Sequence, residues 1–307
     1  MSTTSVADTV KLGAPDRLER LAQKYFGAET VPVQVSFGAL SHPGKVRTQN
    51  EDHFAVVRRY RAREVLLTNM PPQTYPPLCD NSYALAVADG VGGAAFGELA
   101  SMLALQAGYD LTTSAFKWPF KTSESESLEL QEAIRVHVQM IHRRLRSEAR
   151  AGSPLAGMGT TLTGALTVGF DAFIAHAGDS RAYLFRNGTL HRLTRDHTLA
   201  EHLVATGVAH SINDEAVAGF RSTLINCLGG DFEDVSVDTC HVPLREGDQL
   251  LLCTDGLTDM VPEAEIAQLL AEPQTAQQIS QSLVDAALAH GGKDNVTVIL
   301  ARYSVAS

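Results

Sequence analysis

Short apolar runs, separated by polar or glycine-rich turns, dominate the pattern of the chain. Many are rich in β-branched and aromatic residues, which favours strands over short helices. The pattern predicts strands over residues 33–38, 52–57, 84–88, 160–168, 171–177, 181–186, 189–193, 249–253 and 296–303. We expect the second of these strands to pair with the first. Asn187-Gly188 lies between two of the runs and is typical of a hairpin turn.

Other segments carry apolar residues at helical spacing. They predict helices over residues 15–26, 97–111, 128–149, 199–205, 262–270 and 276–290. Strands come in pairs and helices in blocks, an order that favours antiparallel sheets covered by helices. The sequence lacks both an apolar run long enough to span a bilayer and an N-terminal leader pattern, so we expect a cytoplasmic protein.

Composition shifts divide the chain into regions. Residues 1–34 form an N-terminal extension, which is Ser/Thr-rich at its start and expected to be partly disordered around its short helix. Residues 35–304 form the body. Within it, 58–80 is basic and then proline-rich, which indicates a surface insertion. Residues 194–230 are polar and irregular, as expected of a functional loop.

The charge balance narrows the choice of partners. The 307 residues include 25 basic and 35 acidic side chains, for a net charge of −10. This argues against nucleic acid or an anionic membrane as the main partner. The basic runs at 58–63 and 143–146 are better interpreted as solvated faces. Cys79, Cys227, Cys240 and Cys253 show no metal-binding spacing, which indicates free thiols in a reducing compartment.

Four acidic clusters lie beside apolar, strand-like runs or at their ends. They are Glu51-Asp52, Asp89-Gly90, Asp255-Gly256 and Asp294-Asn295. A single Asp-Gly pair is usually just a turn, but four such clusters can converge at the ends of neighbouring strands. Converging carboxylates repel one another unless they are protonated or bridged by cations. Oxygen ligands favour Mg²⁺ or Mn²⁺ over Zn²⁺, so the pattern predicts a site for divalent ions, with two of them.

These clusters and the motifs around them resemble the metal-dependent serine/threonine protein phosphatases of type 2C, in their bacterial-like form. The resemblance runs from about Gly38 to Tyr303 and rests on motifs at 47–52, 87–93, 157–161, 177–181, 194–197, 253–257 and 291–297. Each motif alone is weak, but their order and spacing together are specific. The resemblance implies an α+β fold in which two antiparallel sheets pack as a sandwich with helices on both outer faces.

The resemblance also implies a set of metal ligands. Asp89 would bridge two Mn²⁺ or Mg²⁺ ions, and Gly90 would add its backbone carbonyl. Glu51 would complete the shell of one ion, while Asp255 and Asp294 would complete that of the other. A hydroxide shared by two such ions can attack phosphorus at neutral pH.

Further roles follow from the same resemblance. Arg47 would bind the substrate phosphate, because a guanidinium matches two phosphate oxygens. Asp52 would hold metal-bound waters or ligate weakly, and Asp179 would bind a third, weaker ion together with Asp255. Val91 stands where eukaryotic relatives often have a histidine that is suspected to be the general acid.

The implied function is hydrolysis of phosphoserine and phosphothreonine in proteins, by a monomer that opposes a serine/threonine kinase. His53 and His197 are the nearest substitutes for the missing histidine, although a lone histidine is more often structural. Two other functions stay open at this point. One is a catalytically silent binding module, and the other is a two-metal enzyme that acts on nucleotides or nucleic acid.

Overall fold

The computed structural model describes residues 33–64, 66–67, 69, 78–91, 96–114, 124–151, 157–212 and 214–305. The predicted extension over 1–34 and its helix lie outside these residues, apart from the last two positions. Gly92-Gly93 and the proline-rich part of the predicted insertion also lie outside them. Residues 58–63 and 78–80, at the two ends of that insertion, belong to paired strands.

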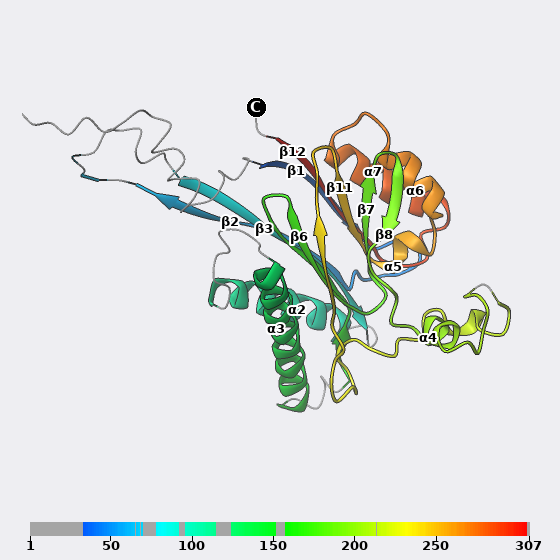
Figure 1. Cartoon of the computed structure of the whole chain (residues 1–307). Helices are drawn as coiled ribbons and strands as arrows, with labels where there is room; N and C mark the ends of the chain where they lie inside the picture. Colours follow the sequence, from blue (N-terminus) through cyan, green and yellow to red (C-terminus); the bar gives the residue numbers. More distant parts are fainter. Residues whose placement is uncertain are drawn as a thin grey trace, which may run out of the picture.

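Two antiparallel sheets form the centre of the molecule (Figure 1). The first has the order β1-β12-β11-β7-β8, and the second has the order β10-β6-β5-β3-β4-β9, with β2 also paired to β3. The strands are β1 Val33–His42, β2 Asp52–Arg63, β3 Leu78–Val91, β4 Gly159–Thr160, β5 Leu162–Val168, β6 Asp171–Ala177, β7 Arg181–Arg186, β8 Thr189–Arg192, β9 Leu228–Gly229, β10 Asp238–Pro243, β11 Gln249–Cys253 and β12 Val296–Val305.

The apolar faces of the two sheets meet in a shared core. Leu85 and Ile174 from the second sheet pack with Leu250, Leu252 and Ile299 from the first. Each of these side chains is almost fully buried. Alternate residues of a strand point to opposite faces, so the neighbouring positions Leu251, Val298 and Leu300 face the helices on the other side.

Helices cover both outer faces of the sandwich (Figure 1). Helix α2 packs on the second sheet through Ala100 and Ala104, and α3 packs on it through Ile134 and Ile141. Helices α6 and α7 pack on the first sheet through Ile266, Ile279 and Leu283. The helices are α2 Phe96–Ser114, α3 Glu124–Ala151, α4 Leu199–Ala205, α5 Asp255–Thr258, α6 Glu263–Leu270 and α7 Ala276–Ala289. The predicted α+β sandwich with helices on both faces is therefore confirmed.

The pairing of the second predicted strand differs from our expectation. Strand β2 does not pair with β1. It pairs along its whole length with β3, from Asp52 opposite Asp89 to Arg63 opposite Leu78. Strand β1 pairs with β12 at the other end of the chain. The consequence is functional, because the β2–β3 register makes two of the predicted site carboxylates cross-strand neighbours.

Most predicted elements appear within a few residues of their expected limits, and Asn187-Gly188 forms a turn with positive φ at both positions, as predicted. Strand β10 and the short helices α5 and Ala218–Phe220 were not predicted. No helix among the described residues has the length and apolar character needed to cross a membrane. Cys227, Cys240 and Cys253 are free thiols, and the side chain of Cys79 lies outside the described part.

Candidate metal and phosphate site

A cavity of about 340 Å³ lies at one end of the sandwich, where segments from both sheets meet. All the predicted site residues except Asp52 line it. They are Arg47, Glu51, Asp89, Gly90, Asp179, Asp255 and Asp294. Five carboxylates from five separate segments thus face one small volume.

The β2–β3 hairpin supplies the first group of these residues. Asp52 is the first residue of β2 and lies opposite Asp89 in the ladder. Just beyond it, the backbone N–H of Gly90 donates to the carbonyl of Glu51 at 3.2 Å. On the other side of Asp89, its backbone N–H donates to the hydroxyl of Thr161 at 3.0 Å. These hydrogen bonds position the backbone of Glu51 and of Asp89 at the cavity.

Asp52 lies behind the cavity and does not line it. Its side chain is buried, and its Oδ2 accepts a hydrogen bond of 2.8 Å from the hydroxyl of Thr254. Burial raises the pKa of this carboxyl from 3.8 to about 7, although hydrogen bonds from Thr297 and Thr254 oppose the shift. Its second oxygen, Oδ1, is buried without a hydrogen-bond partner.

Asp255 and Asp89 form the centre of the site. Thr254 follows β11 and precedes α5, so Asp255 is the first residue of that short helix. Burial raises the pKa of Asp255 to about 6, and the nearby carboxylates of Asp259 and Asp294 raise it further. Burial also raises the pKa of Asp89 well above its usual range, with added repulsion from Asp52 and Asp255. The Oδ1 atom of Asp255 is buried and unpartnered.

These observations fit a site for divalent cations. Buried carboxylates that are crowded together are costly unless positive charge compensates them, and two of these carboxylates leave an oxygen without any partner. The ligands are all oxygens, which suits Mg²⁺ or Mn²⁺. Among the described residues, no three acidic, thiol or imidazole groups lie close enough together to hold one metal ion without some movement of their side chains.

Arg47 faces the same cavity from the loop between β1 and β2. Its Nη2 donates a hydrogen bond of 2.6 Å to Oδ2 of Asp294, and 57% of its side chain is exposed. The hydrogen bond and the charge of Asp294 raise the pKa of the guanidinium. A cation that is both held in place and accessible can meet an incoming phosphate.

Asn295 holds the Arg47 loop in position, a role that the sequence did not reveal. Its buried side-chain amide accepts a hydrogen bond of 2.8 Å from the backbone N–H of Glu51. The same amide donates to the carbonyls of Pro43 and Gln49, at 3.0 and 2.8 Å. These three bonds enclose the loop that carries Arg47. The only signal in the sequence was the position of Asn295 directly after Asp294.

Asp179 lies in the loop between β6 and β7, and the segment 194–197 holds this loop. The backbone N–H of His197 donates to the carbonyl of Gly178 at 2.7 Å. The backbone N–H of Gly178 in turn donates to Nδ1 of His197 at 3.2 Å. Asn226 also contacts this Nδ1, at 2.7 Å, so Nδ1 is the accepting nitrogen.

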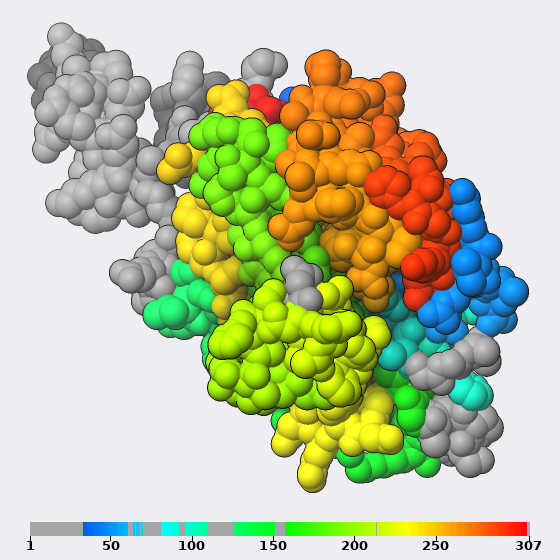
Figure 2. All heavy atoms as spheres, turned by 90° about the vertical axis from the view of Figure 1, so that its right-hand side faces the viewer, coloured from blue at the N-terminus to red at the C-terminus, as the bar shows by residue number. Residues whose placement is uncertain are grey.

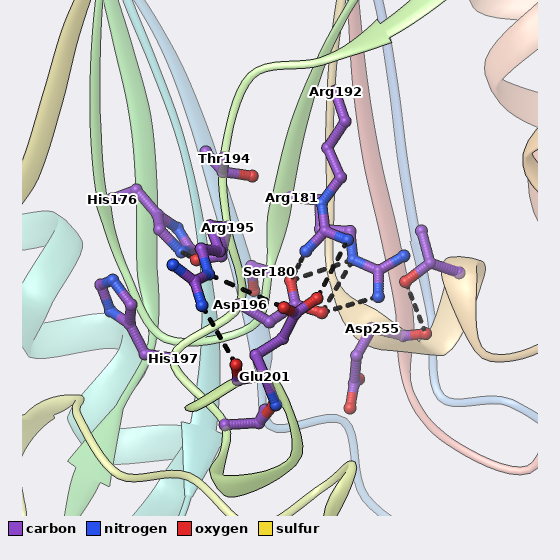
Figure 3. Close-up of polar contacts among 12 residues, drawn as sticks. His176, Ser180, Arg181, Arg192, Thr194, Arg195, Asp196, His197, Glu201 and Asp255 are labelled. Atoms are coloured by element: carbon purple, nitrogen blue, oxygen red, sulfur yellow. Dashed lines mark hydrogen bonds and ion pairs between the residues drawn. The ribbon is translucent and has the colours of Figure 1, made fainter. Parts of the chain in front are cut away.

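An ion-pair cluster fixes the start of the predicted flap beside this loop. Arg181 donates to both oxygens of Asp196, and Arg192 pairs with the same carboxylate (Figure 3). Asp196 is largely buried, so these charges are compensated within the protein. From the flap itself, Ser222 and Leu224 line the cavity. A second cavity of about 50 Å³ adjoins the first and shares Asp179 and Asp255 with it.

Neither of the two candidate substitute histidines lines the cavity. His53 contacts the hydroxyl of Ser101 through Nδ1 at 2.9 Å, and burial lowers the pKa of its imidazole. His197 uses Nε2 toward Asp238 at 3.2 Å and Nδ1 toward Gly178. Both imidazoles therefore have structural partners away from the cavity.

Comparison with known families adds an independent line of evidence. The family model described as Protein phosphatase 2C matches residues 78–290, more than half of the chain. The chain is 37% identical over 221 residues to the serine/threonine phosphatase stp of Listeria welshimeri, which covers 72% of this chain and 84% of that protein. It is 36% identical over 231 residues to the serine/threonine protein phosphatase PstP of Mycobacterium tuberculosis, covering 72% of this chain and 41% of PstP.

Solved structures have the same fold. A serine/threonine phosphatase from S. agalactiae superposes with a TM-score of 0.69 at 27% identity, covering 88% of this chain and 99% of that one. The catalytic domain of PstP, solved in complex with two manganese ions, superposes with a TM-score of 0.68 at 29% identity. This second match covers 89% of this chain and 99% of that one.

Proposed function

The chain belongs to the protein phosphatase 2C family, and we propose on that basis that it hydrolyses phosphoserine and phosphothreonine in proteins. The observation that carries the proposal is the single cavity that Arg47, Glu51, Asp89, Asp255 and Asp294 line together. Such a cavity combines a cation for the phosphate with carboxylates for metal ions. Residues 35–304 would form the catalytic domain, with 58–80 as an insertion and 194–230 as a flap beside the site.

The metal ions would be Mn²⁺ or Mg²⁺, held as a pair by the carboxylates of the cavity. Glu51, Asp89 and the carbonyl of Gly90 would hold one ion, and Asp89, Asp255 and Asp294 would hold the other. When bound, the two ions would supply Lewis acidity and lower the pKa of water enough to provide hydroxide at neutral pH. Asp179 and Asp255 line both cavities, which supports a third, weaker ion between them.

The residues of the chain itself would bind and orient the phosphate. Arg47 offers a planar guanidinium, which suits two phosphate oxygens and stabilises the charge that builds up on them. Hydrolysis breaks the bond between phosphorus and the side-chain oxygen of serine or threonine, and that oxygen must take up a proton. Val91 carries no proton to give, and His53 and His197 do not line the cavity, so we assign proton donation to water.

The proposal includes a place in signalling. A monomer that removes phosphate from serine and threonine would act against a serine/threonine kinase, with phosphorylated proteins as its partners. The net charge of −10 disfavours nucleic acid as a substrate.

The test is release of phosphate from a phosphothreonine peptide, with and without Mn²⁺, by wild type, Asp89→Asn and Asp285→Asn. Asp285 lies on the exposed side of α7 and serves as the matched control. We expect turnover that requires Mn²⁺, is lost in Asp89→Asn and is retained in Asp285→Asn. A folded, metal-loaded wild type without turnover would contradict the proposal. Turnover of nucleotides in preference to phosphopeptides would favour the other two-metal function.

A further inference from the structure

Two lysines lie beside the cavity, on segments from opposite ends of the chain. Lys45 precedes Arg47 by two residues, and Lys293 directly precedes Asp294. They are the lysines that occur within the described residues, since Lys11, Lys24, Lys117 and Lys121 lie outside them. The chain has a net charge of −10, yet Lys45 and Lys293 form a pair of positive charges next to the site.

The side chains of both lysines start beside one glycine turn, Gly291-Gly292. The backbone N–H of Lys45 donates to the carbonyl of Gly292 at 2.7 Å. A Cβ atom built on Gly292 would lie 3.3 Å from Cγ of Lys45, and one built on Gly291 would lie 3.9 Å from Cγ of Lys293. Both aliphatic stems therefore lie against this turn, which requires glycine because φ is 127° at Gly291 and 53° at Gly292.

The space-filling view agrees with this arrangement. Figure 2 shows the blue segment near the start of the described chain in contact with the red segment that precedes and begins β12. No intervening element separates the two segments on this face. The segments that carry the two exposed lysines are therefore neighbours on one face of the molecule.

Both lysines are available to a ligand. Each is exposed, and within the described part of the chain neither takes part in an ion pair or a side-chain hydrogen bond. Arg47, by contrast, is already held by Asp294. An ammonium group that has no internal partner and lies next to a phosphate-binding cavity is suited to a second anionic group of the same ligand.

We propose that Lys45 and Lys293 together bind an acidic side chain of the phosphoprotein substrate, close in sequence to the phosphorylated residue; this rests on the proposed function. Two residues of extended chain span at most about 7 Å, which is the largest Cα separation between Lys45 and Arg47. A substrate held at Arg47 would therefore meet the lysine pair with a residue about one to three positions from the phosphoresidue.

The partner is a short acidic stretch and not a long polyanion. The net charge of the chain, −10, repels an extended polyanion such as nucleic acid. One or two carboxylates, by contrast, interact mainly with the two adjacent lysines. The pair is exposed, so each lysine should contribute modestly, by a factor of about two to five. Salt should weaken the effect, because charges at the surface are screened beyond about 8 Å at physiological ionic strength.

The experiment compares phosphothreonine peptides that are identical except at one residue. This residue is Asp, Ala or Lys, and it is placed either two positions before or two positions after the phosphothreonine. The readout is the ratio of kcat/KM between the Asp and Lys peptides, so that a general change in activity cancels. The variants are Lys45→Glu/Lys293→Glu and Arg245→Glu/Arg302→Glu. The second double variant makes the same charge change at positions away from the cavity.

We expect wild type to favour the Asp peptide at one of the two positions by about five- to twentyfold, less at high salt. Lys45→Glu/Lys293→Glu should reverse this order, and Arg245→Glu/Arg302→Glu should keep it. Equal rates on all peptides with wild type would overturn the lysine proposal alone. The same change of ratio in both double variants would also overturn it, because a diffuse field would then explain the preference. A wild type that hydrolyses none of the peptides would overturn the proposed function together with it.

Discussion

The guanidinium of Arg47 lies 2.6 Å from the carboxylate of Asp294, so the proposed phosphate-binding cation and a proposed metal ligand share one hydrogen bond. More than a third of each side chain is exposed, so water reaches the pair and weakens it. Arg47 therefore competes with any cation at Asp294 for the Oδ2 atom. This relationship gives Arg47→Ala two effects of opposite sign.

We expect Arg47→Ala to lower kcat/KM for a phosphopeptide by about 100-fold, the typical effect of losing a preorganised donor to transition-state charge. The affinity for Mn²⁺ should stay the same or rise by up to about fivefold, because Asp294 is released from a weak, exposed ion pair. Steady-state kinetics and Mn²⁺ titration of the same samples measure both. Arg47→Lys should recover only part of the activity, since an ammonium lacks the planar fork. A parallel loss of Mn²⁺ affinity would assign Arg47 a structural role instead.

Asn295→Ala should impair the site through the loop that Asn295 encloses. The variant leaves the N–H of Glu51 and the carbonyls of Pro43 and Gln49 without their partner. Pro43 and Gln49 are exposed, so water can replace the amide at their carbonyls, and the N–H of Glu51 is the group most affected. At about 1–3 kcal/mol for a group left unsatisfied, we expect the free energy of unfolding to fall by about 1–3 kcal/mol. The loop should become looser, so inorganic phosphate should inhibit more weakly in a competition assay.

Asn226→Ala is the matched control for this prediction. Asn226 is also buried, and it forms a two-way clamp with the backbone of Ser236, at 2.9 Å in both directions. Its removal should reduce stability to a similar degree without touching the Arg47 loop. Equal weakening of phosphate inhibition in both variants would show that the position of the Arg47 loop is not responsible.

Gly256→Ala should be severe because the backbone leaves no room for a side chain. A Cβ atom at this position would lie 1.8 Å from the carbonyl oxygen of Asn295. Helix α5 would have to move away from the start of β12, which would separate Asp255 from Asp294. We expect a loss of about 1–3 kcal/mol in unfolding free energy, as for other overpacked sites, together with loss of Mn²⁺ binding.

Gly219→Ala serves as the control, since a Cβ atom there has no neighbour within 4 Å and its φ is not positive. Its effect on stability should stay within about 0.5 kcal/mol. Urea unfolding of both variants measures the change in stability, and Mn²⁺ titration measures the change in metal binding. Unchanged Mn²⁺ binding in a folded Gly256→Ala would mean that the contact between α5 and β12 does not control the spacing of the carboxylates.

Local patterns were sufficient to predict antiparallel sheets covered by helices and the four acidic clusters, whereas the packing of two sheets as a sandwich was implied by the family resemblance. Alternation along Val33–His42 tells which face of the strand is buried but not which strand lies beside it, so the pairing of β1 with β12 was missed. Strand β10 was missed for a related reason: its residues are only half-buried and its pattern is mixed. Neighbouring residues of an extended segment point in opposite directions, so alternation alone does not tell whether Glu51 or Asp52 faces the cavity. The resemblance assigned Glu51 to a metal ion and Asp52 to bound waters or weak ligation, and in the structure Glu51 lines the cavity while Asp52 does not.

The pH dependence of stability tests the crowded carboxylates directly. In the metal-free protein, the pKa of Asp52 is raised to about 7 and that of Asp255 to about 6, from an ordinary value of 3.8. A carboxyl with a raised folded-state pKa contributes stability that is fully present below the unfolded-state pKa and is lost as pH rises through the folded-state pKa. The shift of Asp255 alone corresponds to about 3 kcal/mol. Stability should therefore fall between about pH 4 and pH 8.

Urea unfolding of protein treated with EDTA, at pH 5 and at pH 8, measures this fall. Asp52→Asn should flatten the profile because it removes one of the buried charges, whereas the exposed Asp285→Asn should leave it unchanged. Adding Mn²⁺ at pH 8 should restore stability, since ions that bind only the folded protein stabilise it, by about 2.7 kcal/mol at 100 times the dissociation constant. A metal-free protein whose stability stays level or rises from pH 5 to pH 8 would show that the carboxylates are compensated by the protein itself, and the case for cations in the cavity would fail.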